Sequence, residues 1–251
     1  MTAGGQQERS KGELIASIAG RVPGRNLHAQ VLWQMGVAIV GGHYPEGSIL
    51  PTDSELLAQF SVSRTVLREV LKTLAAKGMI EARARIGTRV LPRQRWNLFD
   101  TDVLAWHFET GPDVDLLRSL SEVRIGVEVE SAGLAALRRS DEQAEALIAC
   151  AIRMGEATTA EQFARTDLQF HRTVAEASCN PFMASVSALV EFALTAAFTI
   201  SSPVEDDAAM AATVKAHGRI AEAIRAGEPE EARAAMKAVI SEGFARAASR
   251  L

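Results

Sequence analysis

Arg64 and Arg68 are the side chains whose type and spacing point most directly to a chemistry. They lie four residues apart in the segment SVSRTVLREV at 61–70, so on a helix their guanidinium groups share one face. A guanidinium presents a planar fork of donors that can hold guanine O6 and N7, or a phosphate, through two parallel bonds. Small hydroxyl residues flank Arg64 and place it at the start of a helix, where a recognition helix enters a major groove. The pattern predicts a DNA-recognition helix.

A basic hairpin is expected directly after this helix. Residues 79–91 read as two short strands that turn at Ile86 and Gly87. The segment carries three arginines that would line it: Arg83, Arg85 and Arg89. A helix, a turn, a second helix and a basic hairpin together make a winged helix-turn-helix, so we expect the hairpin to be the wing.

A second polar group lies far along the chain. Asp167 and His171 are four residues apart on one expected helix and project from the same face, and His217 lies on a later helix. Spacing alone favours core histidines beside a carboxylate over a binding site. Hydrogen bonds to a bound effector are the functional alternative.

Two further residues in this half have a structural and a functional explanation. Arg124 stands on an otherwise apolar helix and needs an anionic partner, which is either Glu128 one turn later or the carboxylate of an effector. Asn180 precedes Pro181 and either caps the next helix or faces the effector pocket.

Helical periodicity sets the elements that must position these residues. Residues 27–41 form a first helix, Thr52 with Glu55 has the spacing of a capping box for a second, and Gly78 ends the third, which begins at Arg64. From residue 113 onward every segment is expected to be helical: 114–139, 141–156, 160–178, 181–200, 205–226 and 228–249. The prediction is a mainly α protein, with a winged helix-turn-helix followed by an all-α antiparallel bundle.

The same reading divides the chain into four parts. Residues 1–26 are expected to be a flexible arm and 27–92 the DNA-binding domain. Residues 93–112 would be a linker with a short helix, and 113–251 an effector-binding and dimerisation domain.

Charge supports this division. Residues 1–95 carry 13 Lys/Arg and 7 Asp/Glu, whereas residues 96–251 carry 14 and 24, so a basic first half precedes an acidic second half. A basic domain beside an acidic one indicates that the first contacts a polyanion. The two cysteines, Cys150 and Cys179, are expected to be reduced thiols, and we expect a cytoplasmic protein without a signal peptide or membrane contact.

These features resemble the GntR family of bacterial regulators, in its FadR-like branch with a helical ligand-binding domain. The matching stretches are GSILPTDSELLAQFSVSRTVLREVLKTLAAKGMIEARARIGTRV, SEVRIGVEVESAGLAA, DLQFHRTVAEASCNPF and HGRIAEAIRAGEPEEARAAM. The segment RWNLFDTDVLAW is similar to the subgroup that contains repressors of galactonate and related sugar-acid operons. The resemblance implies DNA contacts by these residues: Ser63, Arg64, Thr65, Arg68 and Gly87 with its neighbours. Ser54 stands where the fatty-acid-responsive member has arginine, so the operator sequence need not be the same.

The resemblance also implies a divalent metal. Many bundles of this branch bind one through Asp-x3-His and two further histidines, which here gives Asp167, His171 and His217. The last histidine position is Val239, which cannot ligate, so the site would hold Zn²⁺ with an open position or hold no metal and hydrogen-bond the effector directly. The resemblance further implies that Arg124 clamps the effector carboxylate.

The leading hypothesis is a dimeric, ligand-responsive repressor that binds a short inverted repeat in double-stranded DNA and is released by a sugar acid such as galactonate. One alternative keeps the DNA-binding architecture and changes the effector to an acyl-CoA or another carboxylate. A less favoured alternative is a metal-dependent enzyme that uses Asp167, His171 and His217. No nucleophile–base pair stands near those positions in the sequence, and the basic wing would have no purpose in an enzyme, so we expect no catalytic activity.

Overall fold

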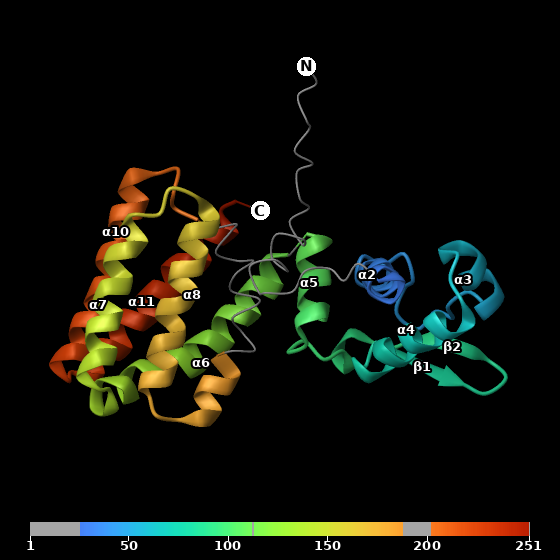
Figure 1. Ribbon diagram of the computed structural model, residues 1–251, viewed down its shortest axis with the longest axis horizontal. Helices are drawn as coiled ribbons and strands as arrows, with labels where there is room; N and C mark the ends of the chain where they lie inside the picture. Colours follow the sequence, from blue (N-terminus) through green and yellow to red (C-terminus); the bar gives the residue numbers. More distant parts are fainter. Residues whose placement is uncertain (1–25, 112, 188–201, 251) are drawn as a thin grey trace, which may run out of the picture. The chain divides into compact units, whose positions relative to one another are not determined.

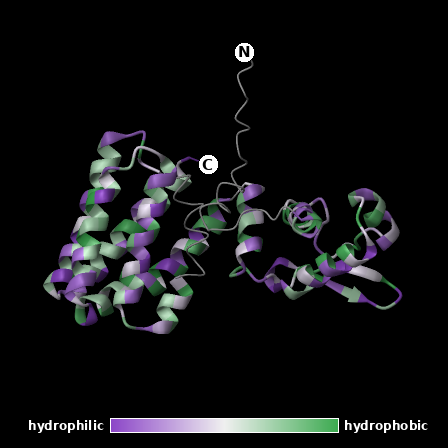
Figure 2. Cartoon of the chain, in the orientation of Figure 1, coloured by the Kyte–Doolittle hydropathy of each residue, from purple (hydrophilic) through white to green (hydrophobic). Residues whose placement is uncertain are grey.

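The computed structural model describes residues 26–111, 113–187 and 202–250. The chain divides into two compact units, Met1–Pro112 and Asp113–Leu251, and each is described by itself. Among the described helices, none combines the length and apolarity needed to cross a membrane. In Figure 2 the helices of both units carry hydrophobic and hydrophilic faces, as amphipathic helices around a core do.

Three capped helices build the body of the first unit. Their bounds are Leu27–Val40 for α2, Asp53–Phe60 for α3 and Arg64–Ala76 for α4 (Figure 1). Thr52 and Glu55 form the expected capping box, in which the Thr52 N–H donates to Glu55 Oε2 at 2.7 Å. Ser63 caps α4, and Gly78 follows α4 with a φ of 75° that glycine adopts without strain. Apolar side chains from α2, α3, α4 and the strands close the core of this unit: Met35, Ile39, Leu56, Leu67, Val70, Leu74, Met79 and Val90.

The expected hairpin follows α4. Strand β1 (Ile80–Arg83) pairs antiparallel with β2 (Gly87–Val90). Its base is joined to the loop after α2: Ile49 forms a bridge with Arg89, and the Leu50 N–H donates to the Thr88 carbonyl at 2.8 Å. The base of the wing is therefore held on both sides, and only its tip extends beyond the pairing.

Residues that were expected to be a linker are part of the first unit. A short 3-10 helix (η1, Arg93–Arg95) leads to α5 (Thr101–Glu109), which packs on α2. A Cβ on Gly36 of α2 would lie 2.3 Å from the Trp106 ring, so glycine is what allows this close approach. Lys77, largely buried, pairs with Asp100 and Asp102 at 2.7 Å each and ties the end of α4 to the start of α5. Residues 93–111 are thus fixed to the helices of the first unit rather than hanging free.

The second unit is a helical bundle. Its helices are α6 (Val114–Arg138), α7 (Asp141–Gly155), α8 (Ala160–Ala177), α10 (Asp207–Ala226) and α11 (Pro229–Ala248). They close into a ring in which α6 packs on α11, α11 on α10, α10 on α7, α7 on α8, and α8 back on α6 (Figure 1). Residues 181–187 are helical too, and the remainder of the expected helix 181–200 lies outside the described residues, as does the arm up to residue 25. The predicted fold class, a winged helix-turn-helix followed by an all-α bundle, is confirmed.

Candidate functional site

The predicted recognition helix presents its functional residues to solvent. Ser63, Arg64, Thr65 and Arg68 are all exposed at the start of α4. Ser63 has a second task, because its Oγ accepts the Val66 N–H at 3.3 Å and caps the helix. Arg64 and Arg68 therefore stand on a helix whose first turn is fixed by its own cap.

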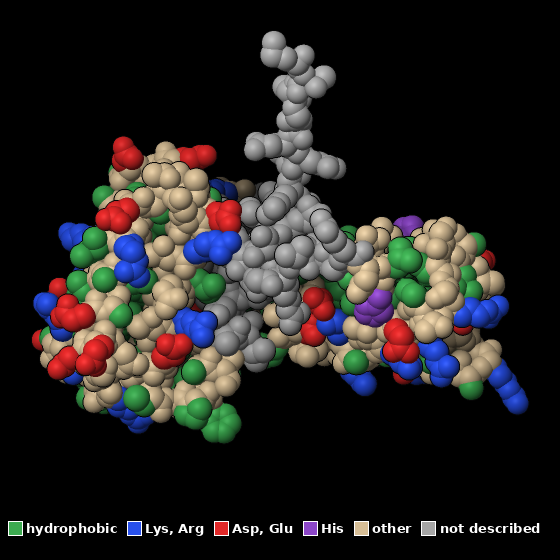
Figure 3. All heavy atoms as spheres, in the orientation of Figure 1, with side chains coloured by type: hydrophobic (Ala, Val, Ile, Leu, Met, Phe, Trp, Pro, Cys, Tyr) green, Lys and Arg blue, Asp and Glu red, His purple; other side chains and the backbone are tan. Residues whose placement is uncertain are grey.

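A groove of about 450 Å³ runs between this helix and the wing. Its lining combines acidic, basic, apolar and hydroxyl side chains: Asp53, Leu57, Arg64, Leu67, Arg68, Leu71, Lys72, Ala75, Ile80, Ala82 and Thr88. Figure 3 shows several Lys and Arg side chains on the surface of this unit, with acidic side chains among them. Three basic side chains of α4, Arg64, Arg68 and Lys72, thus line a groove that the strands of the wing also border.

The wing arginines differ in their surroundings. Arg83 pairs with Glu81 at 2.7 Å, and Arg85 is exposed at the tip with a φ of 64° beside Gly87, whose φ is 115°. Arg89 is half-buried and its Nε donates to the Gly47 carbonyl at 3.2 Å, so it braces the wing base. All three, with Gly87, stay predictions as DNA contacts, and Arg85 is the one best placed to reach a phosphate.

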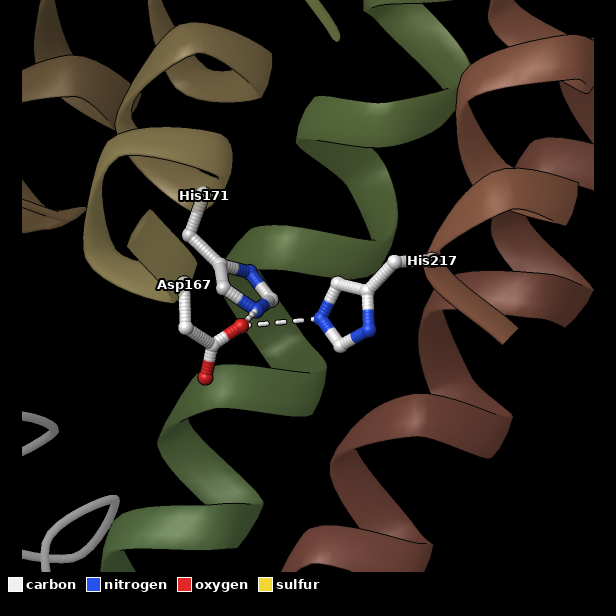
Figure 4. Close-up of side chains that lie close together, drawn as sticks. All are labelled: Asp167, His171 and His217. Carbon is white, nitrogen blue, oxygen red and sulfur yellow. Dashed lines mark ion pairs between the residues drawn. The ribbon is translucent and has the colours of Figure 1, made fainter. Parts of the chain in front are cut away.

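The second unit brings Asp167, His171 and His217 together, as Figure 4 shows. Asp167 and His171 come from α8 and His217 reaches across from α10, and all three are buried. One ligand atom from each lies within 4.8 Å of the others. Asp167 Oδ1 is 2.9 Å from His217 Nε2 and 3.5 Å from His171 Nε2. Sequence spacing could place the first two on one face, but only the fold brings in the third.

Both imidazole rings are fixed on their far side. His217 Nδ1 is 2.8 Å from the Thr213 carbonyl, which can only accept, so Nδ1 carries a proton and Nε2 faces Asp167. His171 Nδ1 lies 2.7 Å from Glu128 Oε2. Metal-ligating histidines have this arrangement, with the outer nitrogen held by a carbonyl or carboxylate and the inner one turned to the ion.

The donor set fits a small divalent cation such as Zn²⁺. Two imidazole nitrogens and one carboxylate oxygen are ligands that zinc accepts. Asp167 Oδ1 and His217 Nε2 are buried and lie 2.9 Å apart. A bound ion would be held by these two atoms together with a nitrogen of His171.

Arg124 forms an ion pair with Glu128, one turn later on the same helix. Its Nε lies 2.7 Å and its Nη2 3.2 Å from the two oxygens of Glu128, and both residues are buried. The structure thus contains the ion pair that was the structural alternative for Arg124. A contact to the effector carboxylate stays a prediction.

Burial and charge act against each other in this network. Burial raises the pKa of Glu128, but Arg124 and His171 outweigh it and bring the pKa down to about 2. Burial likewise raises the pKa of Asp167, and the charges and hydrogen bonds of His217 and His171 hold that pKa below its usual range. Burial lowers the pKa of His171, whereas Glu128 and Asp167 raise it to about 9. Without metal, His171 is therefore an imidazolium at neutral pH.

This balance predicts a pH-dependent stability of the metal-free protein. The folded pKa of His171, about 9, exceeds the ordinary value of 6.5, so its contribution is full below pH 6.5 and is lost as the pH rises through 9. We expect the free energy of unfolding to fall by roughly 2 kcal/mol between pH 6.5 and 8. Because all three tryptophans lie before residue 113, a circular dichroism transition without a tryptophan fluorescence change reports the second unit. Added zinc should abolish the fall, and a flat profile in EDTA would contradict the prediction.

Two of the other predicted positions have structural roles. Asn180 Oδ1 accepts the Phe182 N–H at 3.0 Å and so caps the helix that starts at Pro181, which leaves an effector contact as a prediction. Val239 is buried in the apolar cluster of the bundle and supplies no ligand atom. Sequence reasoning missed Glu128 as a neighbour of His171, and it missed Arg246, whose charge interacts with that of Asp167. The only sequence signal for Glu128 was its place one turn after Arg124.

Each of the two units matches a known protein family or domain. Residues 29–90 match the model for bacterial regulatory proteins of the gntR family, and residues 119–242 match the FCD domain. A 33% identical relative, the galactonate operon transcriptional repressor of Escherichia coli strain K12, matches 86% of this chain and 95% of its own length. The chain belongs to the GntR family. This GntR-family protein is a transcriptional regulator rather than an enzyme, with an N-terminal DNA-binding domain and a C-terminal domain for a small-molecule effector.

Other relatives agree on the class of protein. The transcriptional repressor NanR of Cronobacter sakazakii is 29% identical over 95% of this chain and 93% of its own length. Among solved structures, Lar, which controls the expression of the Listeria monocytogenes agr system, has a TM-score of 0.63 at 21% identity and covers 89% of this chain and 97% of its own. That structure supports the fold.

Proposed function

We propose that this regulator represses a sugar-acid catabolic operon and leaves its DNA when an aldonic acid such as D-galactonate binds the second unit. The observation that carries the proposal is the buried cluster of Asp167, His171 and His217 in the domain that takes the effector. The 33% identity to a galactonate operon repressor supports the choice of acid.

The cluster suits a hydroxy acid for a chemical reason. Asp167, His171 and His217 would hold Zn²⁺ with at least one coordination position open to a ligand, because Val239 adds no donor. Bound zinc would supply a Lewis-acidic centre for the carboxylate and 2-hydroxyl oxygens of an aldonic acid. The chain itself orients the histidines through Glu128 and the Thr213 carbonyl.

The proposal predicts release of DNA by an acid and not by its uncharged analogue. Fluorescence anisotropy of a labelled fragment from the gene's own upstream region would follow dissociation with D-galactonate, D-gluconate and D-galactitol. We expect galactonate to release the protein and galactitol to leave it bound, with release lost after EDTA dialysis and restored by zinc. Full release in metal-free protein would show that the cluster binds the acid by hydrogen bonds alone. Release by none of the acids would contradict the sugar-acid proposal.

DNA recognition is proposed to rest on Arg64 and Arg68, with Arg85 at a phosphate. Arg64→Ala should cost about 1–3 kcal/mol of specific binding free energy because a base contact is lost. Arg85→Ala should weaken all sequences alike and reduce the slope of log affinity against log salt by about one. Arg118→Ala, an exposed arginine of the second unit, serves as the control. Unchanged operator affinity in Arg64→Ala would remove that residue from the interface.

We also propose a homodimer that binds an inverted repeat. Two recognition helices related by a two-fold axis would meet half-sites about 10 base pairs apart. Light scattering of the free protein, together with footprinting, would test it. A monomer that protects a single half-site would contradict it.

A further inference from the structure

The residue that caps the C-terminal end of α4 carries a buried charge. Lys77 follows the last residue of the recognition helix, and its side chain is only 9% exposed. Its Nζ lies 2.7 and 2.8 Å from the two oxygens of Asp100 and 2.7 Å from Asp102 Oδ2. One ammonium group thus donates to two carboxylates, and we call Lys77, Asp100 and Asp102 the α4–α5 clamp.

Both sides of the clamp belong to helix ends. Asp100 is the N-cap of α5, where its Oδ1 accepts the N–H groups of Asp102 at 2.9 Å and of Val103 at 3.3 Å. The same carboxylate therefore holds the first turn of α5 and the ammonium group at the end of α4. The backbone adds a second link, because the Asn97 N–H donates to the Lys77 carbonyl at 2.9 Å. A movement of the first turn of α5 would act directly on the end of the recognition helix.

Gly78 lets the two segments come this close. Its φ of 75° reverses the chain directly after Lys77, in a conformation that glycine adopts without strain. A Cβ at this position would collide with the carbonyl oxygen of Arg95, a backbone atom that cannot rotate away. The chain after α4 is thus packed against the segment that leads into α5, and this packing keeps Lys77 next to Asp100.

Stability alone does not explain a buried lysine at this position. Removing an ammonium group from water costs free energy, and apolar residues of similar volume often stabilise a protein as well as a buried ion pair does. What the ion pair adds is direction, because its charge-assisted hydrogen bonds form in one arrangement of the partners. Since α4 and α5 each pack on α2, the clamp fixes how the recognition helix is oriented relative to α5.

α5 is also the helix through which the chain enters the second unit. Only residues 110–113 separate its last residue, Glu109, from Val114, the first residue of α6. The second unit is the part of the protein that takes the small-molecule effector. A change that the effector produces in α6 reaches the first unit at α5, because the covalent path between the units runs through this helix.

We propose that the α4–α5 clamp transmits effector binding to the recognition helix, with Lys77 carrying a displacement of the first turn of α5 into α4. This rests on the proposed function for its signal, the release of DNA by an acid. Lys77, Asp100 and Asp102 act as positioning residues, since they line neither the groove beside α4 nor the Asp167 cluster. Their loss should therefore separate DNA binding from its regulation.

A neutral clamp tests this without leaving a charge unpaired. The triple variant Lys77→Met, Asp100→Asn and Asp102→Asn removes all three charges, and asparagine caps a helix about as well as aspartate does. Asp102→Asn alone keeps the cap and the ion pair with Asp100. Urea unfolding followed by tryptophan fluorescence shows whether the first unit is folded, because all three tryptophans lie in it. Glu46→Gln, which removes a carboxylate from an exposed pair with Arg93 in the same unit, is the control.

Fluorescence anisotropy with the gene's upstream fragment gives the DNA affinity, and titration calorimetry gives the affinity for D-galactonate. In the wild-type protein and in Glu46→Gln, saturating acid should lower the DNA affinity by about 5–150-fold, the usual range of coupling between two sites. In the triple variant the DNA affinity without acid and the acid affinity should stay within about threefold of wild type, since neither binding site is altered. Saturating acid should then leave its DNA affinity nearly unchanged, and Asp102→Asn should be intermediate.

The outcomes separate this inference from the proposed function. A folded triple variant that acid releases from DNA as it does the wild type would overturn the clamp as the route while leaving a sugar-acid regulator intact. If the triple variant does not fold or does not bind DNA, Asp102→Asn decides, and wild-type release in that variant would overturn the clamp. A wild-type protein that no acid releases would contradict the proposed function and remove the signal that the clamp is to carry.

Discussion

Asp167→Asn is expected to abolish zinc binding and to destabilise the metal-free second unit by about 3–5 kcal/mol. Asp167 is the anion that two buried imidazoles share, at 2.9 Å from His217 and 3.5 Å from His171. The amide keeps the shape but removes the charge, so the imidazolium of His171 loses one of its two neighbouring anions. It also removes the single carboxylate ligand from a set of three.

Two measurements check this expectation. Competition with a chromophoric chelator gives the zinc affinity, and urea unfolding followed by circular dichroism gives the stability of the EDTA-treated variant. Glu161→Gln is the matched control, since Glu161 lies on the same helix in an exposed pair with Arg165. A variant that keeps stoichiometric zinc would show that Asp167 is not a ligand.

Gly36→Val is expected to destabilise the first unit by about 3 kcal/mol, the upper end of the overpacking range. The Trp106 ring occupies the place of a side chain at position 36, with ring atoms 2.3 Å from the ideal Cβ. The Trp106 ring cannot move away, because it is fully buried, and α2 cannot move away, because core residues pack on its other side. The variant must displace α5 from α2.

Tryptophan fluorescence reports this directly, as every tryptophan of the chain lies in the first unit. We expect an earlier urea transition by fluorescence, weaker operator binding and unchanged zinc affinity. Gln34→Val introduces the same side chain on the exposed face of α2 and should leave the transition in place. An unshifted transition in Gly36→Val would mean that α5 and α2 separate without cost.

Sequence predicted the features that depend on neighbours along the chain. The Thr52–Glu55 capping box, the start of α4 at Arg64 and the exposed pair Arg64 and Arg68 all follow from spacings of three or four residues. Helix bounds in the second unit agree with expectation within two residues where they are described, because Ser140, Gly227 and Pro229 mark them locally.

Contacts between segments far apart in the chain could not be predicted from local spacing. Sequence placed Arg89 in the wing, where it lies on β2, but its bond to the Gly47 carbonyl joins residues 42 positions apart and could not be predicted locally. Residues 93–112 looked like a linker because nothing local reveals that Lys77 binds Asp100 and Asp102. Tertiary pairing decided both cases.

The cluster of Asp167, His171 and His217 also depends on contacts that sequence spacing could not predict. Asp167 with His171 is a helical spacing, yet His171 meets Glu128 only because α8 packs on α6. Arg246 gave no signal at all, since an arginine near the end of an alanine-rich helix is ordinary on a surface. Only the fold shows that its Nε is buried and that its charge interacts with that of Asp167 on another helix.

The base of the wing has a consequence for the entropy of DNA binding. The loop after α2 lies along β2, through the bridge of Ile49 with Arg89 and the bonds of Gly47 and Leu50 to Val90 and Thr88, so β2 is paired on both sides before any DNA binds. Ordering a residue costs about 1–2 kcal/mol of conformational entropy. A protein that orders only the tip around Arg85 on association avoids most of that cost, and its binding should show a small entropic penalty even where the contact surface is wide.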